Sequence, residues 1–246
     1  MTLFYNLKII YLYKYIMTKI AYITLTNAGY VDYTLNCLKS LELLGQNRLL
    51  EVYCIDKVAI DKLTDYPLKY LLDVPDEEIE TEMQSFRTGN WNKVVFQKFR
   101  AIHKALLEND YVYFTDGDIV YKSDRFIRDL KNRMEDEDLD LLIQNDKQHD
   151  DDHSELCSGV MFIRSNEKTK QFFNPQFIDV DLIKCDQIYV NNMKNHLNYE
   201  LLPLRRYPNG LYYHQKQPNN PYLIHYNYLI GNDKREMMLK DNNWLI

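Results

Sequence analysis

The chain has 246 residues, of which 46% are hydrophobic and 27% charged, and its formal net charge is −6. This is the composition of an ordinary globular protein, and the length suits one sizeable α/β domain. The acidic balance, with no block rich in lysine or arginine, argues against a nucleic-acid partner. The four cysteines show no C-x-x-C spacing, so we expect reduced thiols rather than a disulfide framework or a zinc site.

The first sixteen residues, MTLFYNLKIIYLYKYI, are apolar but interrupted by Lys8 and Lys14. No small-residue cleavage site follows them, and a second methionine, Met17, precedes a good strand pattern. We interpret residues 1–16 as a leader or alternative-start extension in preference to a membrane anchor, and residues 17–246 as the domain. The expectations are therefore no integral membrane segment and a cytoplasmic location.

In chain order, hydrophobic patterns of the first half predict a strand that starts at residue 19 and ends near Thr24, a helix at 31–45, a strand at 49–56 and a short strand within 66–74. Gly45 is the expected C-terminal cap of the first helix. A polar, acidic loop at 75–90 then precedes a long helix at 91–110, with Asn90 or Asn92 as its N-cap. Its apolar stripe is Val95, Phe99, Ile102 and Leu106.

That helix leads directly into the strand YVYFT at 111–115. Strands and helices alternate, which predicts a mostly parallel sheet with helices on its faces. Ligands of such sheets bind beyond the carboxyl ends of the strands. The residues that follow strand ends, namely 27–30, Asp56, Asp116 and Asp118, are therefore expected to meet in one crevice.

The second half is less regular. It predicts a strand at 139–143, a polar loop, a strong strand at 157–165 and helices at 167–173 and 184–196. The remainder, from residue 199, is expected to mix short strands with tyrosine-rich turns. The run HDDDH at 149–153 has the composition of a metal cluster, but without an apolar scaffold a solvated loop is the preferred interpretation. One domain with two lobes fits this organisation.

The segment Asp116-Gly117-Asp118 ends the strand at 111–115 with two carboxylates. Such a pair is stable beside a cation or in water, and a hard divalent ion such as Mg²⁺ or Mn²⁺ suits oxygen ligands shared with phosphates. The alternatives are an exposed Asp-Gly turn or the nucleophile motif of a haloacid-dehalogenase-like phosphatase. An EF-hand is excluded because Ile119, Val120 and Tyr121 stand where ligands would be required.

A shared order of motifs carries a family resemblance from about Lys19 to the C-terminus. The motifs are AYITLTNAGY, VYCID, YFTDGDIVYKSD, CSGVMFIRSN, CDQIYVNN, YPNGLYYH and IHYNYLIGNDK. This order resembles the GT-A class of nucleotide-sugar glycosyltransferases, most closely the nucleotide-diphospho-sugar transferase family (glycosyltransferase family 77), and more distantly the glycogenin-like family. The resemblance implies a Rossmann-like α/β sheet flanked by helices, with a smaller irregular lobe on the acceptor side.

The resemblance also implies a metal site under the diphosphate of the sugar nucleotide. Asp118 would be the main ligand of Mn²⁺ or Mg²⁺, Asp116 would bind the metal or the ribose, and His225 would be a further metal ligand. Gly231 and Lys234 would contact the diphosphate. The chemistry agrees, because a nucleoside diphosphate leaving group develops negative charge that a metal and a lysine stabilise.

Further donor-binding positions follow from the same resemblance, and each also has a plainer interpretation as a turn, cap or surface residue. Asp56 would accept a hydrogen bond from uracil, and Arg100 would reach the diphosphate or the sugar. Asp186 and Gln187 would face the donor sugar, with Asp186 stabilising the transition state or acting as nucleophile. The other expected contacts are Thr24, Asn27, Ala28, Gly29 and Tyr30 for the nucleotide, and Gly117, Ser158 and Gly159 for the donor.

Together these features predict a metal-dependent glycosyltransferase, retaining in mechanism, that moves a sugar from a UDP-sugar to a hydroxyl of a glycan, protein or small molecule. Two alternatives stay open. One is the phosphatase, with Asp116 as nucleophile. The other is a catalytically silent protein that binds a nucleotide sugar. The sequence departs from the family pattern after Asp118, where no tryptophan and proline follow, and in the longer spacing from His225 to Gly231.

Overall fold

The computed structural model of the protein describes residues 18–64, 66, 70–72, 91–135, 138–179 and 185–246. The predicted extension at 1–16, the acidic loop at 75–90 and the candidate cap Asn90 lie outside the described residues.

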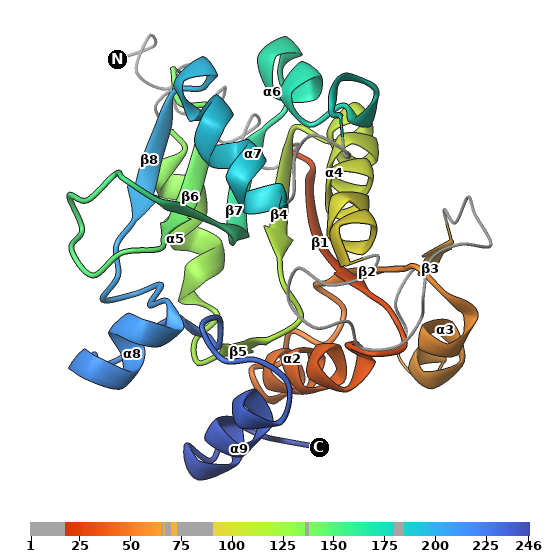
Figure 1. Ribbon diagram of the computed structural model, residues 1–246, viewed down its shortest axis with the longest axis vertical. Helices are drawn as coiled ribbons and strands as arrows, with labels where there is room; N and C mark the ends of the chain where they lie inside the picture. The colour runs from red at the N-terminus through yellow and green to blue at the C-terminus, as the bar shows by residue number, and fades with distance from the viewer. Residues whose placement is uncertain (1–17, 65, 67–69, 73–90, 136–137, 180–184) are drawn as a thin grey trace, which may run out of the picture.

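Seven of the described strands form one sheet in the order β3-β2-β1-β4-β7-β6-β8 (Figure 1). These strands are β1 (Ile20–Thr26), β2 (Glu51–Cys54), β3 (Tyr70–Leu72), β4 (Tyr111–Thr115), β6 (Leu141–Asn145), β7 (Leu156–Arg164) and β8 (Tyr199–Leu202). A separate pair, β5 (Ile119–Tyr121) and β9 (Leu223–His225), forms a small antiparallel sheet. The turn Asp116–Asp118 joins β4 of the large sheet to β5 of the small one.

The large sheet is mostly parallel, as predicted. Strand β1 pairs in parallel with β2 and β4, β2 with β3, and β6 with β8. Strand β7 alone among these runs antiparallel to its neighbours, β4 and β6. The parallel half follows from the alternation of buried strands and amphipathic helices. The direction of β7 was not predicted, because pairing between distant segments leaves no local pattern.

Helices cover both faces of the sheet. They are α2 (Val31–Leu43), α3 (Lys57–Leu63), α4 (Trp91–Glu108), α5 (Arg125–Arg133), α6 (Glu167–Phe172), α7 (Asp186–Met193), α8 (Gly210–Lys216) and α9 (Asn232–Lys240). The described residues also include two short 3₁₀ helices, η1 (Pro175–Phe177) and η2 (Lys194–His196). Within the described part of the chain, no helix is both long and apolar enough to cross a membrane.

Two hydrophobic cores lie on opposite faces of the sheet. On one face, α4 and α7 lie side by side (Figure 1), and the α4 residues Phe99, Ile102 and Leu106 are buried as the apolar stripe predicts, with Val95 partly buried. On the other face, α2 and α5 pack through buried leucines and Phe126. Burial of this apolar surface is the main force that fixes the strand order.

The end of the chain differs from the prediction. Residues after β8 were expected to form short strands and turns, yet they include the helices α8 and α9 besides β9. The side chain of Asn209 caps α8 by accepting a hydrogen bond from the Tyr212 N–H. Asparagine is a favoured N-cap residue, so Asn209 could have indicated a helix start, but the neighbouring tyrosines led to the prediction of turns. Helix α4 begins at Trp91, so Asn92 lies inside the helix and is not its cap.

Gly45 has the predicted capping role. Its φ is +74°, in the left-handed region, and its N–H donates to the carbonyl of Glu42 at 2.9 Å. All four cysteines are buried free thiols, as predicted.

The side chain of Asp140 links three segments of the second half of the chain through hydrogen bonds. Its buried carboxylate accepts hydrogen bonds from Asn166 Nδ2 (2.7 Å), Lys168 Nζ (3.0 Å) and the Asn198 N–H (2.9 Å), which ties the start of β6 to α6 and to the turn before β8. Because Asp140→Ala leaves these donors unpaired, we expect it to lower the free energy of unfolding by about 1–3 kcal/mol at neutral pH.

The same variant should show a defined pH dependence. Burial raises the pKa of Asp140, but the Asn198 N–H, Lys168 and Asn166 outweigh burial and lower it overall. A carboxyl with a lowered native pKa stabilises the fold above its unfolded pKa of about 3.9 and loses that contribution as pH falls through the native pKa. The difference in Tm between wild type and variant should therefore be constant near neutrality and shrink below about pH 4. The exposed Asp32→Ala is the control, and a pH-independent difference would contradict the argument.

Candidate functional site

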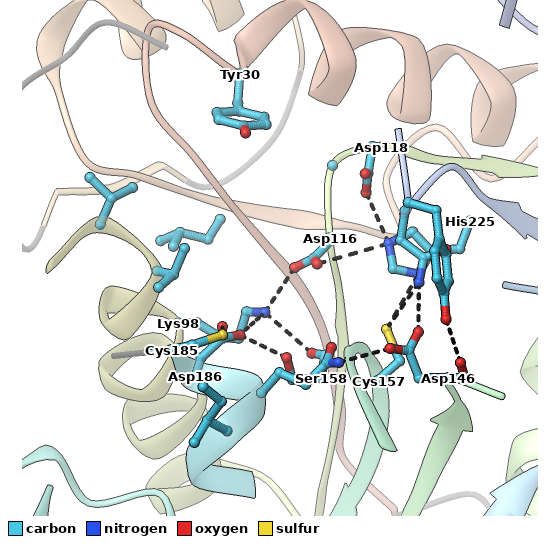
Figure 2. Close-up of a pocket in the computed structure, with 18 of the residues that line it drawn as sticks. Tyr30, Lys98, Asp116, Asp118, Asp146, Cys157, Ser158, Cys185, Asp186 and His225 are labelled. Atoms are coloured by element: carbon cyan, nitrogen blue, oxygen red, sulfur yellow. Dashed lines mark hydrogen bonds and ion pairs between the residues drawn. The ribbon is translucent and has the colours of Figure 1, made fainter. Parts of the chain in front are cut away.

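A cavity of about 610 Å³ opens at the carboxyl ends of β1 and β4. This is the place where a parallel sheet binds ligands. The chain brings together side chains that are far apart in sequence, from the turn after β1, helix α4, the turn after β4, strand β7, helix α7 and the segment 225–234. Figure 2 shows several of them directed at one another.

Asp116, Asp118 and His225 form a cluster at the floor of this cavity (Figure 2), with one ligand atom from each within 4.8 Å of the others. His225 Nε2 lies 3.1 Å from Asp118 Oδ1 and 3.9 Å from Asp116 Oδ2. The histidine is held there by β9, whose pairing with β5 places His225 opposite Ile119, next to the aspartates. These are the three residues predicted to hold a metal.

The cluster fits a divalent cation on two observations. Asp118 Oδ1 is buried and, among the described residues, receives no hydrogen bond, although the histidine nitrogen is close. An unpaired buried carboxylate oxygen is costly, and a cation between it and the imidazole nitrogen removes that cost.

Gly159 provides the second observation. A Cβ at this position would lie 2.3 Å from His225 Cε1 and 2.7 Å from Asp116 Oδ2. The bare backbone of β7 therefore leaves the space between the histidine and the aspartate that an ion requires. Carboxylate oxygens with one imidazole suit Mn²⁺ or Mg²⁺ better than a soft metal.

Lys234 lies on the other side of Asp118. Its buried Nζ is 2.5 Å from Asp118 Oδ2 and 5.7 Å from the centre of the Tyr33 ring. Burial raises the pKa of Asp118, but Lys234 and then His225 outweigh it and lower the pKa well below its usual range. Burial lowers the pKa of Lys234, and Asp118 reverses this, so the lysine stays charged. A cation is thus fixed beside the predicted metal site.

A second buried lysine, Lys98 of α4, connects Asp116 with Asp186 (Figure 2). Its Nζ lies 3.1 Å from Asp116 Oδ1, 2.5 Å from Asp186 Oδ2 and 3.3 Å from the Ser158 carbonyl. Ser158 Oγ also donates to Asp186 Oδ2 at 2.7 Å. Burial raises the pKa of Asp186, but Lys98 and Ser158 outweigh it, so the carboxylate is ionised. Asp186 therefore presents a fixed negative charge to the cavity.

The turn after β1 contributes only part of the predicted nucleotide pocket. Asn27 and Tyr30 line the cavity, and Asn27 Nδ2 is buried without an acceptor among the described residues. Thr24, Ala28 and Gly29 do not line it. Asn27 therefore offers the clearest free donor for a ligand on this side.

Asp56 and Arg100 are placed differently from the prediction. Asp56 does not line the cavity, because its two carboxylate oxygens accept from the Ala28 N–H (2.7 Å) and the Ala59 N–H (2.8 Å), which caps α3. Arg100 donates to Gln97 on its own helix, away from the cavity lining. Asp56 thus joins the turn after β1 to the start of α3. Lys98 of α4 lines the cavity, whereas Arg100 does not.

The remaining predicted residues lie in or near the cavity. Gly117 and Gln187 line it, and Gln187 Nε2 donates to Asp146 Oδ2 at 2.8 Å. A Cβ on Gly117 would lie 2.5 Å from Thr34 Oγ1, so α2 packs closely against this turn. Gly231 is not part of the lining, but it precedes α9 with φ +54° and its carbonyl accepts from Tyr33 Oη at 2.8 Å. It orients the helix that carries Lys234.

Sequence reasoning missed Lys98, Gln144, Asp146, Asn227 and Tyr228. Asp146 follows the end of β6 and accepts hydrogen bonds from Gln187 and Asn227, while burial raises the pKa of its carboxyl. The signal that identified Asp116, a polar residue directly after a buried strand, was also present in the run LLIQND. Lys98 left no such signal, because a lysine on an amphipathic helix is usually exposed.

Solved structures share this fold. A glycosyltransferase involved in glycosylation of the major capsid of the virus PBCV-1 has a TM-score of 0.56 at 11% identity, covering 90% of this chain and 99% of the other. An active-site mutant of LgtC has a TM-score of 0.56 at 10% identity, and the match covers 85% of this chain and 88% of LgtC. GlyE of Streptococcus pneumoniae has a TM-score of 0.56 at 12% identity, and the match covers 93% of this chain and 61% of GlyE. These likenesses, at 10–12% identity, define the class of fold, which is that of the GT-A glycosyltransferases.

The family assignment follows from the sequence match. Residues 46–239 match the nucleotide-diphospho-sugar transferase family, and the chain belongs to that family. A curated relative, the UDP-galactose:fucoside alpha-3-galactosyltransferase of Dictyostelium discoideum, is 28% identical over 291 aligned positions, which cover 95% of this chain. The chain spans 44% of that relative's length. Family membership implies a nucleotide-sugar donor and favours a transferase over the phosphatase alternative.

Proposed function

We propose that the protein transfers a sugar from a UDP-sugar to an acceptor hydroxyl, with Mn²⁺ or Mg²⁺ bound by Asp116, Asp118 and His225. The observation that carries this proposal is the aspartate–aspartate–histidine cluster on the floor of the cavity at the carboxyl ends of β1 and β4. A divalent ion bound there supplies Lewis-acid stabilisation of the departing diphosphate.

Several side chains of the protein would share this task. Lys234, a buried cation beside Asp118, is positioned to neutralise diphosphate charge that the metal does not reach. Asn27 and Tyr30 would bind the nucleoside part, with Asn27 Nδ2 as donor and the Tyr30 ring as a stacking surface. Ser158 and Gly159 would allow the donor sugar to approach the backbone of β7.

Asp186 and Gln187 are the proposed groups at the reacting carbon. The ionised Asp186 carboxylate would stabilise the positive charge that develops on the donor sugar in an oxocarbenium-like transition state. Lys98 and Ser158 hold one of its oxygens, which fixes the carboxylate in a single orientation. Gln187, held by Asp146, would orient the sugar through its amide.

We propose retention of configuration and UDP-galactose as the first donor to test. The curated relative is named as an alpha-3-galactosyltransferase that uses UDP-galactose. The galactose of UDP-galactose is α-linked, so an α-linked product means that the anomeric configuration is kept. A fucoside is, for the same reason, the first acceptor to test.

The proposal is tested by calorimetric titration of UDP into the protein with and without Mn²⁺. Wild type is expected to bind UDP in a Mn²⁺-dependent manner. Asp118→Asn removes one charged ligand of the proposed metal site. Loss of a residue that only hydrogen-bonds a metal ligand typically lowers metal affinity by about 10–100-fold, so UDP binding in the presence of Mn²⁺ should weaken by at least this factor. Asp32→Asn, on the exposed surface of α2, is the matched control and should bind as wild type does.

The outcomes separate the three possible functions. UDP release from UDP-galactose on addition of a fucoside supports the transferase. Metal-dependent UDP binding with no release and no transfer for any donor or acceptor tried supports the catalytically silent alternative. If UDP does not bind under any metal condition, the proposal is wrong, and hydrolysis of small phosphomonoesters becomes the assay of choice.

A further inference from the structure

His225 is held on two sides by groups that compete for its proton. On one side, Nε2 faces Asp118 Oδ1 at 3.1 Å and Asp116 Oδ2 at 3.9 Å. On the other side, Nδ1 lies 2.7 Å from Gln144 Oε1. The ring is almost completely buried. A neutral imidazole carries one proton, so only one of its nitrogens can donate and the other presents a lone pair. Only the tautomer with hydrogen on Nδ1 leaves Nε2 free to bind a metal ion.

The orientation of the Gln144 amide is fixed by its surroundings. Gln144 Nε2 lies 3.0 Å from the Tyr207 carbonyl and 3.1 Å from the Pro208 carbonyl. Both carbonyls can only accept hydrogen bonds, so the amide NH₂ must face them. The amide oxygen therefore must face His225 Nδ1. Gln144 is fully buried, and water cannot substitute for these partners.

The two carbonyls are themselves held in place. Pro208 oxygen also accepts from the backbone N–H of His225, and Asn209 Nδ2 donates to the carbonyls of Asn145 and Lys147. The register between β6 and β7 shifts at Gln144, which lies opposite Cys157, whereas Ile143 lies opposite Met161. Irregularities of this kind redirect side chains beside functional sites. Here the irregularity places Gln144 behind His225 and Gly159 in front of it.

We propose that Gln144 is a positioning residue that keeps the proton of His225 on Nδ1 and so keeps Nε2 available to a divalent cation. The inference rests on the proposed metal site, and it adds a residue outside the cavity lining. Without the Gln144 acceptor, the carboxylate of Asp118 would draw the proton to Nε2, where it would block the lone pair.

The tautomer is read directly from a two-bond ¹H–¹⁵N correlation spectrum of protein labelled at histidine, recorded without metal at mildly alkaline pH. The signal of His225 is identified by its absence in His225→Gln. In wild type we expect the Nδ1–H pattern. In Gln144→Met, which keeps length but removes the acceptor, we expect the Nε2–H pattern.

Metal affinity gives the second readout, with Mn²⁺ alone as the probe and free Mn²⁺ measured by electron paramagnetic resonance. Gln144→Met should lose about 10–100-fold in affinity. Gln171→Met, on the exposed face of α6, is the matched control and should change neither readout.

Two results would overturn the inference. One is a wild-type His225 with its proton on Nε2, and the other is a folded Gln144→Met protein that keeps the Nδ1–H pattern or the wild-type affinity for Mn²⁺. If Gln144→Met does not fold, wild type still decides, because it must show the Nδ1–H pattern. A wild type that shows this pattern but binds neither Mn²⁺ nor UDP contradicts the proposed function and not the tautomer assignment.

Discussion

Gly159→Ala is expected to lower the rate of UDP formation from UDP-galactose by about 100-fold, the typical cost of displacing reacting groups by an ångström. The added Cβ would lie 2.3 Å from His225 Cε1 and 2.7 Å from Asp116 Oδ2, well inside van der Waals contact. Either the histidine or the aspartate must then move away from the other. Mn²⁺-dependent binding of UDP, measured by calorimetry, should fall together with the rate.

Gly45→Ala is the matched control for this variant. Gly45 also resists substitution, because its φ is +74°, but no described atom lies within 4 Å of the added Cβ and the residue is at the far end of α2. We expect it to cost about 1 kcal/mol of stability through backbone strain and to leave UDP binding unchanged. Equal loss of binding in both variants, or wild-type binding by Gly159→Ala, would show that the glycine does not define the site.

Lys98→Met is expected to destabilise the protein by about 3–5 kcal/mol, the cost of leaving buried charge without its partner. Lys98 is the cation between Asp116 and Asp186, and its side chain is only 6% exposed. Burial lowers the pKa of Lys98, but the two aspartates raise it well above the usual range, so the lysine is charged in the native state. Urea denaturation measures the loss, and turnover should fall as well, because Asp186 loses the group that fixes it.

A double variant separates charge from packing. Lys98→Met with Asp186→Asn removes one of the two unpaired carboxylates, so part of the lost stability should return while activity should not. Lys39→Met, which breaks a surface pair with Glu42, should change stability by less than about 1 kcal/mol. If Lys98→Met behaves like Lys39→Met, the pairing of Lys98 with Asp116 and Asp186 contributes nothing to the stability of the fold.

The sequence predicted best what local patterns determine. The strands β1 to β4 and the helices α2 and α4, though not α3, follow from hydrophobic periodicity. The position of Asp116 and Asp118 follows from the rule that ligands bind at the carboxyl ends of parallel strands. His225, more than 100 residues after Asp116 in the chain, was found only through the family resemblance, because no local pattern links a distant histidine to a strand end.

The differences between the predicted and the observed placement of these residues have physical causes. Asp56 was predicted as a nucleobase contact, but a helix N-terminus directly after the strand takes both of its oxygens. Arg100 and Lys98 lie two residues apart on α4 and therefore point to different faces, and the sequence could not tell which face meets the buried carboxylates. The proposed role of Gln144 could not be predicted for a different reason. It depends on hydrogen bonds from the Gln144 amide to the backbone carbonyls of Tyr207 and Pro208, and no pattern of side chains in the sequence indicates such bonds.

The order in which the site's residues occur along the chain has a consequence for synthesis. The seven-stranded sheet is complete at Leu202, and by then Asp116 and Asp118 are in place, but His225 and Lys234 have not yet been made. Chains grow from the N-terminus and their domains can begin folding before release. A nascent chain that has finished its large sheet thus carries two acidic groups without the histidine and the lysine that complete their surroundings. At the site proposed here, donor binding would therefore begin only after β9 has paired with β5.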